Sequence, residues 1–88
     1  APEPLPVYHI LRMYTLVKAY DMLDFGKMRY NLLGNADHWF PGVKASTFDE
    51  QQLLYGLGDY PFADRVPDIL RETHALLNEA DLKRASES

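Results

Sequence analysis

Histidine is the side chain in this sequence with the widest chemical use, because it both transfers protons and binds metals. The three histidines, His9, His38 and His74, lie far apart in the chain, and none has a second histidine or a carboxylate four residues away. Metal-binding and metalloprotease motifs place such ligands at short, regular spacing. The sequence therefore predicts neither a metal site nor a bound cofactor.

Nucleophilic catalysis also lacks its usual residues. The sequence contains no cysteine, which excludes disulfides, thiolate nucleophiles and cysteine-based metal sites. It has no G-x-S-x-G motif, and Ser46 and Thr47 lie where a helix is expected to start. His38, beside Trp39, is the one candidate proton shuttle, but a polar loop residue next to aromatic rings gives the same pattern. We therefore expect that the protein is not an enzyme.

Aromatic residues are the most unusual feature of the sequence. It has six tyrosines, four phenylalanines and one tryptophan among 88 residues. Tyr8, Tyr14 and Tyr20 are six residues apart, so on one helix they point about 120° from one another. Side chains in three directions do not fit one small core, and Tyr and Trp are enriched at binding interfaces. The sequence thus predicts a partner-binding surface made of Tyr8, Leu11, Tyr14, Tyr20, Trp39 and Phe40.

The polar residues of the segment 7–25 lead to the same prediction. They recur at every third position, at His9, Arg12, Thr15, Lys18, Asp21 and Asp24. A step of three residues rotates the position by about 60° around a helix, so the polar side chains spiral and leave apolar surface on every side. Further along, the turn signals Gly34-Asn35 and Pro41-Gly42 flank Trp39 and are expected to hold its ring out.

These residues belong to an all-α chain of about three helices, because no segment alternates with period two as a half-buried strand would. The Pro-rich lead 1–6 is expected to be extended. Residues 7–84 are expected to form a single helical domain, followed by a polar tail at 85–88. The first helix starts at the beginning of that domain and either breaks at Gly26 or continues to a cap at Gly34.

A long aromatic-rich loop is expected to span 34–47, between the first and second helices. Thr47 and Glu50 have the spacing of a capping box, which predicts that the second helix starts there and ends at Gly56. The third helix tolerates Pro67 in its first turn. Its apolar residues recur with helical spacing, at Val66, Ile69, Leu70, Thr73, Leu76, Leu77 and Ala80.

Charge is distributed unevenly along the chain. The net charge is −4 and the pI about 5.2, with +1 on residues 1–44 and −5 on residues 45–88. Phosphate binding needs clustered Lys and Arg, so the acidity argues against a nucleic-acid partner. The acidic half, with Glu72 and Glu79 outward on the third helix, is either a solvated face or a docking surface for a basic partner. Charged residues interrupt the apolar segment 7–25, so no membrane span is expected.

These features predict a non-catalytic accessory subunit that packs on a larger protein or associates with its own copies. The alternative is a small stand-alone protein that binds a ligand in a groove between helices lined by Trp39 and Phe40. The chain starts with Ala1 and Pro2 rather than with Met, as chains often do after removal of a signal peptide, although removal of a tag leaves a similar start. We therefore expect a periplasmic or secreted protein, with a large periplasmic oxidoreductase as its host.

Overall fold

The computed structural model describes residues 6–21, 24–55 and 63–87, and within these ranges the chain contains helices and no strand. The elements are α1 (Val7–Tyr20), α2 (Phe25–Gly34), α3 (Ala36–Trp39), α4 (Glu50–Leu54), the 3-10 turn η2 (Ala63–Arg65) and α5 (Val66–Glu87). The prediction of an all-α fold is confirmed. The predicted number of about three helices is too low, because the described residues form five α-helices.

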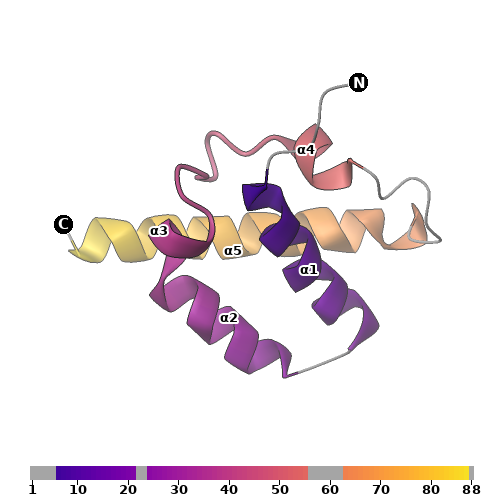
Figure 1. Cartoon of the computed structure of the whole chain (residues 1–88), viewed down its shortest axis with the longest axis horizontal. Helices are drawn as coiled ribbons and strands as arrows, with labels where there is room; N and C mark the ends of the chain where they lie inside the picture. Colours follow the sequence, from indigo (N-terminus) through magenta and orange to yellow (C-terminus); the bar gives the residue numbers. More distant parts are fainter. Residues whose placement is uncertain (1–5, 22–23, 56–62, 88) are drawn as a thin grey trace.

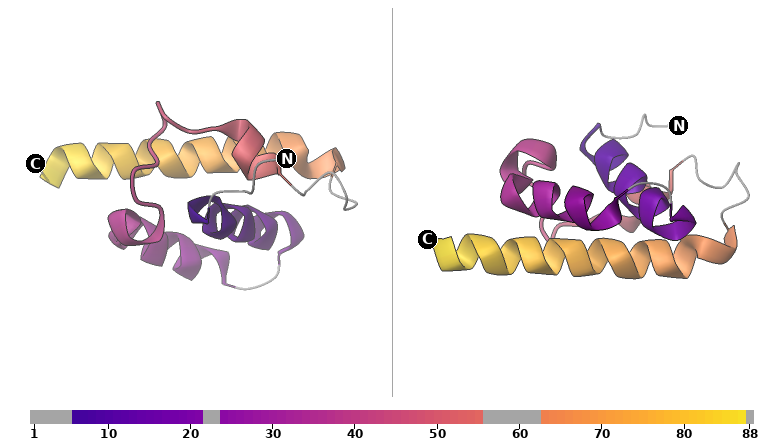
Figure 2. Two further views of the ribbon diagram at one scale, coloured as in Figure 1. Left: turned by 45° about the horizontal axis from the view of Figure 1, so that its top comes forward. Right: turned by 90° about the horizontal axis from the view of Figure 1, so that it is seen from below.

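The helices form two layers. Helix α5 is a long straight rod that makes one layer, and α1, α2 and α3 lie together on one side of it (Figure 2, right). Helix α4 lies near the start of α1, at the opposite end of the molecule from α2 (Figure 1). Helix α1 contacts α2, α4 and α5, so three helices pack against it.

The chain breaks between α1 and α2 before Gly26, which lies inside α2. Asp21 ends α1 in the left-handed conformation, with a φ of 50°, and Asp is one of the few residues besides Gly that tolerate it. Asp24 then starts α2, since its carboxylate accepts a hydrogen bond from the Lys27 N–H at 3.0 Å. Both alternatives are therefore wrong: the first helix neither breaks at Gly26 nor continues through it, because α1 ends at Asp21 and α2 starts at Asp24. The last helical residue of α2 is Gly34, as predicted, although the cap is Asn35.

The expected loop 34–47 is not continuous, because α3 interrupts it. The Trp39 N–H donates to the Asn35 carbonyl at 3.1 Å, and the Phe40 N–H donates to the Ala36 carbonyl at 2.9 Å. Ala36 and Phe40 are both buried, so this single turn is pinned to the core at both ends. Trp39 therefore lies at the end of a short helix and not in an open loop.

Helix α4 starts without the predicted capping box. The Thr47 hydroxyl accepts the Lys44 N–H at 3.0 Å and is used in the preceding turn. Asp49 takes its place, because its carboxylate accepts the N–H groups of Gln51 and Gln52 at 3.0 and 3.4 Å. The helix ends at Leu54, and Gly56 lies outside the described residues.

Helix α5 confirms the amphipathic pattern read from the sequence. Its buried residues are Ile69, Thr73, Leu76, Leu77 and Ala80, and Pro67 lies in its first turn, where its missing N–H costs nothing. The helix continues to Glu87, so residues 85–87 extend it and do not form a separate tail. No helix within the described ranges is long and apolar enough to cross a membrane.

The core lies between α1 and α5 and is closed at one end by α4. Leu11, Leu53 and Leu76, from these three helices, are all fully buried. The Arg12 guanidinium extends from α1 to the end of α4, where it donates to the carbonyls of Leu53 at 2.8 Å and Gln52 at 2.6 Å. These carbonyls are among those that a helix leaves unpaired at its end, so Arg12 both caps α4 and fixes it on α1.

Candidate interaction surface

The structure separates the six residues predicted to bind a partner into two groups. Tyr8, Leu11, Tyr14 and Phe40 are at most 3% exposed and belong to the core of the chain itself. Their surface is not available to a partner, because α2, α4 and α5 pack against α1 and Phe40 is fully buried as well. Tyr20 and Trp39 are exposed by 39% and 41% and remain candidates.

The buried tyrosines direct their hydroxyls to partners within the chain. The Tyr8 hydroxyl accepts the Asp49 N–H at 2.8 Å, and its ring stacks on Phe48 with centroids 5.8 Å apart. The Tyr14 hydroxyl donates to the Glu72 carboxylate at 2.6 Å and accepts from the Arg29 guanidinium at 2.7 Å. A tyrosine can thus be buried with its polar tip satisfied, which is how two of the three differently directed tyrosines fit inside this fold. The third, Tyr20, is 39% exposed.

Arg29 is the centre of the polar network that fixes α2 to the rest of the molecule. It forms ion pairs with Glu72, at 3.3 Å, and with Glu79. Burial raises the pKa of the Tyr14 phenol above its usual value, and the hydrogen bond to Glu72 raises it further. Desolvation lowers the pKa of Arg29, but the contacts with Tyr14, Glu79 and Glu72 outweigh it, so the net shift is upward. Glu72 therefore faces this network and not the solvent, which corrects its predicted outward position.

An apolar groove with a volume of about 340 Å³ lies beside α2, and we call it the α1–α2 groove. Leu32 is buried and Ile10 and Met28 are half-buried, so these three side chains form its floor. Exposed residues form its rim. The rim residues are Asp24, Lys27, Asn31 and Trp39.

Trp39 lines this groove from a short helix whose backbone is anchored in the core. It is the last residue of α3, between the buried anchors Ala36 and Phe40. The rings of Trp39 and His38 pack edge to face, with their centroids 5.0 Å apart and their planes at 82°. A tryptophan side chain has only two rotatable bonds, so its ordering on binding costs little conformational entropy. Trp39 therefore has the properties of a binding anchor.

A second hollow, of about 430 Å³, lies on the other flank of α2, against α5. It contains the two most exposed large apolar side chains of the described residues, Tyr30 at 78% and Leu82 at 71%. Sequence reasoning missed both residues. For Leu82 a signal was present, because it lies on the side of α5 opposite the buried residues and interrupts an otherwise polar face. Tyr30 had no such signal, since its exposure depends on what packs against α2.

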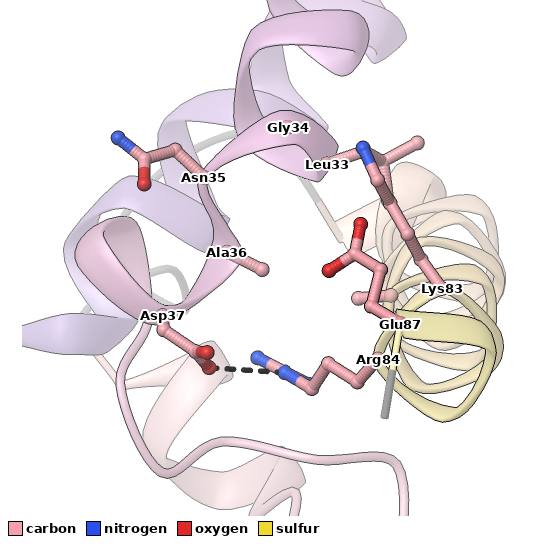
Figure 3. Close-up of a pocket in the computed structure, with 9 residues that line it drawn as sticks. Leu33, Gly34, Asn35, Ala36, Asp37, Lys83, Arg84 and Glu87 are labelled. Carbon is pink, nitrogen blue, oxygen red and sulfur yellow. Dashed lines mark hydrogen bonds and ion pairs between the residues drawn. The ribbon is translucent and has the colours of Figure 1, made fainter.

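A third hollow, of about 240 Å³, lies where α2, α3 and the end of α5 meet. Figure 3 shows Arg84 of α5 extending to Asp37 of α3, and their atoms are 3.0 Å apart. Arg84 also pairs with Asp81 at 3.1 Å, so its guanidinium is already neutralised. This polar hollow is thus closed by an internal ion-pair cluster and offers less to a ligand than the α1–α2 groove.

Neither chemistry nor relatedness indicates another site. Among the described residues, no three His, Asp or Glu side chains are grouped as they would be around a metal ion. Comparison with protein-family models, with curated proteins and with solved structures finds no match to this chain.

Proposed function

We propose that this chain is a non-catalytic interaction subunit that binds a larger protein through the α1–α2 groove. The observation that carries the proposal is the position of Trp39, which lines an apolar groove next to the buried Phe40 while remaining 41% exposed. Exposed aromatic anchors beside apolar hollows are characteristic of binding hot spots.

The shape of the groove favours a protein partner over a free small ligand. Its volume of about 340 Å³ is within the range of ligand sites. However, four of its seven lining residues are exposed, so it covers only one side of an occupant. Small ligands are usually enclosed on most sides, whereas a segment of a larger protein is held in place by its own body as well. The ligand-binding alternative is therefore the second choice.

The nature of the host is a separate prediction. That the host is a large periplasmic oxidoreductase stays a prediction. Native mass spectrometry of the complex would identify the host by its mass and sequence. Self-association through the same groove is a competing outcome of that experiment.

The proposal is tested by native mass spectrometry of the tagged chain isolated from its source. We expect a complex with a larger protein, and we expect Trp39→Ala to weaken that complex by about 2–4 kcal/mol. Tyr55→Ala is the matched control, because Tyr55 is 40% exposed but does not line the groove. Recovery of the wild-type chain only as a folded monomer would contradict the proposal and favour the ligand-binding alternative.

A further inference from the structure

We infer that the hollow between α2 and α5, which we call the α2–α5 hollow, is an interface between two copies of this chain. The copies are related by a two-fold axis that passes through the hollow, so that Tyr30 of each packs against Leu82 of the other. The α2–α5 hollow shares no lining residue with the α1–α2 groove. The interface therefore goes beyond the proposed function and leaves the groove open to the host.

The apolar side chains of this hollow are unusually exposed. Tyr30 is 78% and Leu82 is 71% exposed, and both line the same hollow of about 430 Å³. The half-buried Leu33 lines it as well. Adjacent large apolar side chains on a surface mark contacts with other proteins, because covering them removes apolar area from water.

The apolar residues are arranged so that the surface fits an inverted copy of itself. In a two-fold interface, residue i of one copy contacts residue j of the other, and j contacts i. Tyr30 comes from α2 and Leu82 from α5, so they line the hollow from its two different helices. An axis through the hollow exchanges these helices, and the contact between the Tyr30 ring and the Leu82 side chain forms twice.

The charges of the hollow also match an inverted copy. Its lining includes one acid and one base, Glu79 and Lys83, which lie one turn apart on α5. Arg29 engages one oxygen of the Glu79 carboxylate, and within the described residues the Lys83 ammonium has no ion-pair partner. The axis makes the two α5 helices antiparallel, which brings Lys83 of each copy toward Glu79 of the other. A strongly acidic or basic partner would oppose one of the two charges, whereas a second copy pairs both.

The size of the contact sets its expected strength. A buried tyrosine contributes about 150–250 Å², whereas a stable interface buries about 1,200–2,000 Å² in total. Tyr30 and Leu82 from two copies supply less than half of that area. We therefore expect a weak dimer, with a Kd on the order of 100 µM.

The test is sedimentation equilibrium of the purified chain from about 10 µM to about 1 mM. The wild-type chain is expected to shift from monomer to dimer over this range. Leu82→Glu brings a carboxylate into each half of the interface and is expected to weaken the dimer at least about tenfold, and Tyr30→Ala about tenfold. Met13→Glu is the matched control, because Met13 is 44% exposed on α1 and lines neither the hollow nor the groove. It is expected to leave the dimer unchanged.

A charge exchange tests the antiparallel arrangement. Lys83→Glu gives a surface with two acids and Glu79→Lys one with two bases, so each variant alone is expected to dimerise at least about tenfold more weakly than the wild type. An equimolar mixture is expected to form the heterodimer, which native mass spectrometry separates from both homodimers by mass. Far-UV circular dichroism verifies that each variant is folded, since Glu79 also pairs with Arg29.

Three results would overturn the inference. The wild-type chain stays monomeric at the highest concentration. The dimer persists unchanged in folded Leu82→Glu. The dimer is abolished by Trp39→Ala but not by Leu82→Glu, which moves the contact between copies to the α1–α2 groove. The proposed function is decided separately, by whether a native complex with a larger protein is recovered and is weakened by Trp39→Ala.

Discussion

Helices α1 and α2 are neighbours in the chain, yet they have opposite roles in the fold. Helix α1 has five buried residues among 14, whereas α2 has one among ten. Helix α1 packs against α2, α4 and α5, while α2 lies at the lower edge of the molecule in Figure 1 with hollows on both flanks. A helix that is apolar on every side is therefore not necessarily a binding helix, because the elements packed against it determine which of its surface stays exposed.

The two helices are also fixed by different forces. Helix α1 is held by apolar burial, with Leu11 and Tyr14 fully buried. Helix α2 has one fully buried side chain, Leu32, while Phe25, Met28 and Leu33 are half-buried against the core. Arg29 adds partly exposed ion pairs to α5. Partly exposed ion pairs stabilise less than a buried apolar side chain. Helix α2 is therefore the more weakly held of the two.

The largest expected effect concerns apolar burial. Leu11→Ala in α1 is expected to lower the free energy of unfolding by about 2–5 kcal/mol, because it leaves a cavity in the core. Tyr30→Ala in α2 is expected to change it by less than about 0.5 kcal/mol, since Tyr30 is 78% exposed. Urea denaturation of the two variants measures both values. Similar losses from both substitutions would contradict the assigned difference between α1 and α2.

The next effect concerns the polar link between α2 and α5. Arg29→Ala is expected to lower the free energy of unfolding by about 1–3 kcal/mol, because it leaves the half-buried Glu72 carboxylate without its cation. Arg71→Ala is the control, since its ion pair with Asp68 joins two largely exposed side chains and is worth about 0.5 kcal/mol or less. A loss for Arg29→Ala no greater than for the control would show that the network does not hold α2.

The same network predicts a response to alkaline pH. The pKa of Tyr14 is raised from 10.0 in the folded chain, so its stabilising contribution is complete below the ordinary pKa and is lost as pH rises above it. Above pH 10 the unfolded chain releases this proton more readily than the folded chain, and stability falls by up to about 1 kcal/mol per pH unit. Tyr14→Phe removes this contribution. Denaturation between pH 9 and 11 should therefore show a shallower decline for Tyr14→Phe than for the wild type, and parallel declines would exclude the raised pKa.

The smallest expected effect is a stabilisation of α2. Gly26 lies inside the helix, and a Cβ there would meet the Asp24 carboxylate only at an ordinary 3.6 Å. Gly26→Ala is expected to raise the free energy of unfolding by about 0.5–1 kcal/mol, because Ala has less freedom in the unfolded chain. Gly42→Ala is the control and is expected to destabilise, because Gly42 has a φ of +75°. Thermal unfolding of both variants measures the two opposite signs.

Sequence reasoning succeeded where local pattern alone determines structure. The apolar spacing from Ile69 to Ala80 predicted the buried face of α5, because one side of that helix packs on a single layer. The break at Asp21 was not predictable in the same way, since a left-handed Asp leaves no distinct pattern in the residues around it. The predicted cap at Thr47 was wrong, because its hydroxyl is used in the turn at Lys44 and the Asp49 carboxylate accepts the first N–H groups of α4 instead.

The candidate surface was only partly predictable for a related reason. Trp39 was identified because turn residues flank it, and it remains exposed. Tyr8 and Tyr14 were assigned to the surface because their rings point in different directions, but α4 and the Arg29 network satisfy their hydroxyls inside the molecule. Met28 was not assigned to a site, because its place in the groove follows from how α2 packs beside α1. Exposure of this kind is a property of tertiary contacts and not of local sequence.

Hydrogen–deuterium exchange tests the central claim most directly, that α1 serves the core while α2 and α3 present the binding surface. In the free chain, amides of α1 around Leu11 and Tyr14 are expected to exchange most slowly, and those of α2 faster. In the complex isolated from the source, new protection is expected in α2 and around Trp39, with little change in α1. New protection confined to the outer face of α5, around Arg71 and Asn78, would instead identify the acidic half as the docking surface and contradict the account.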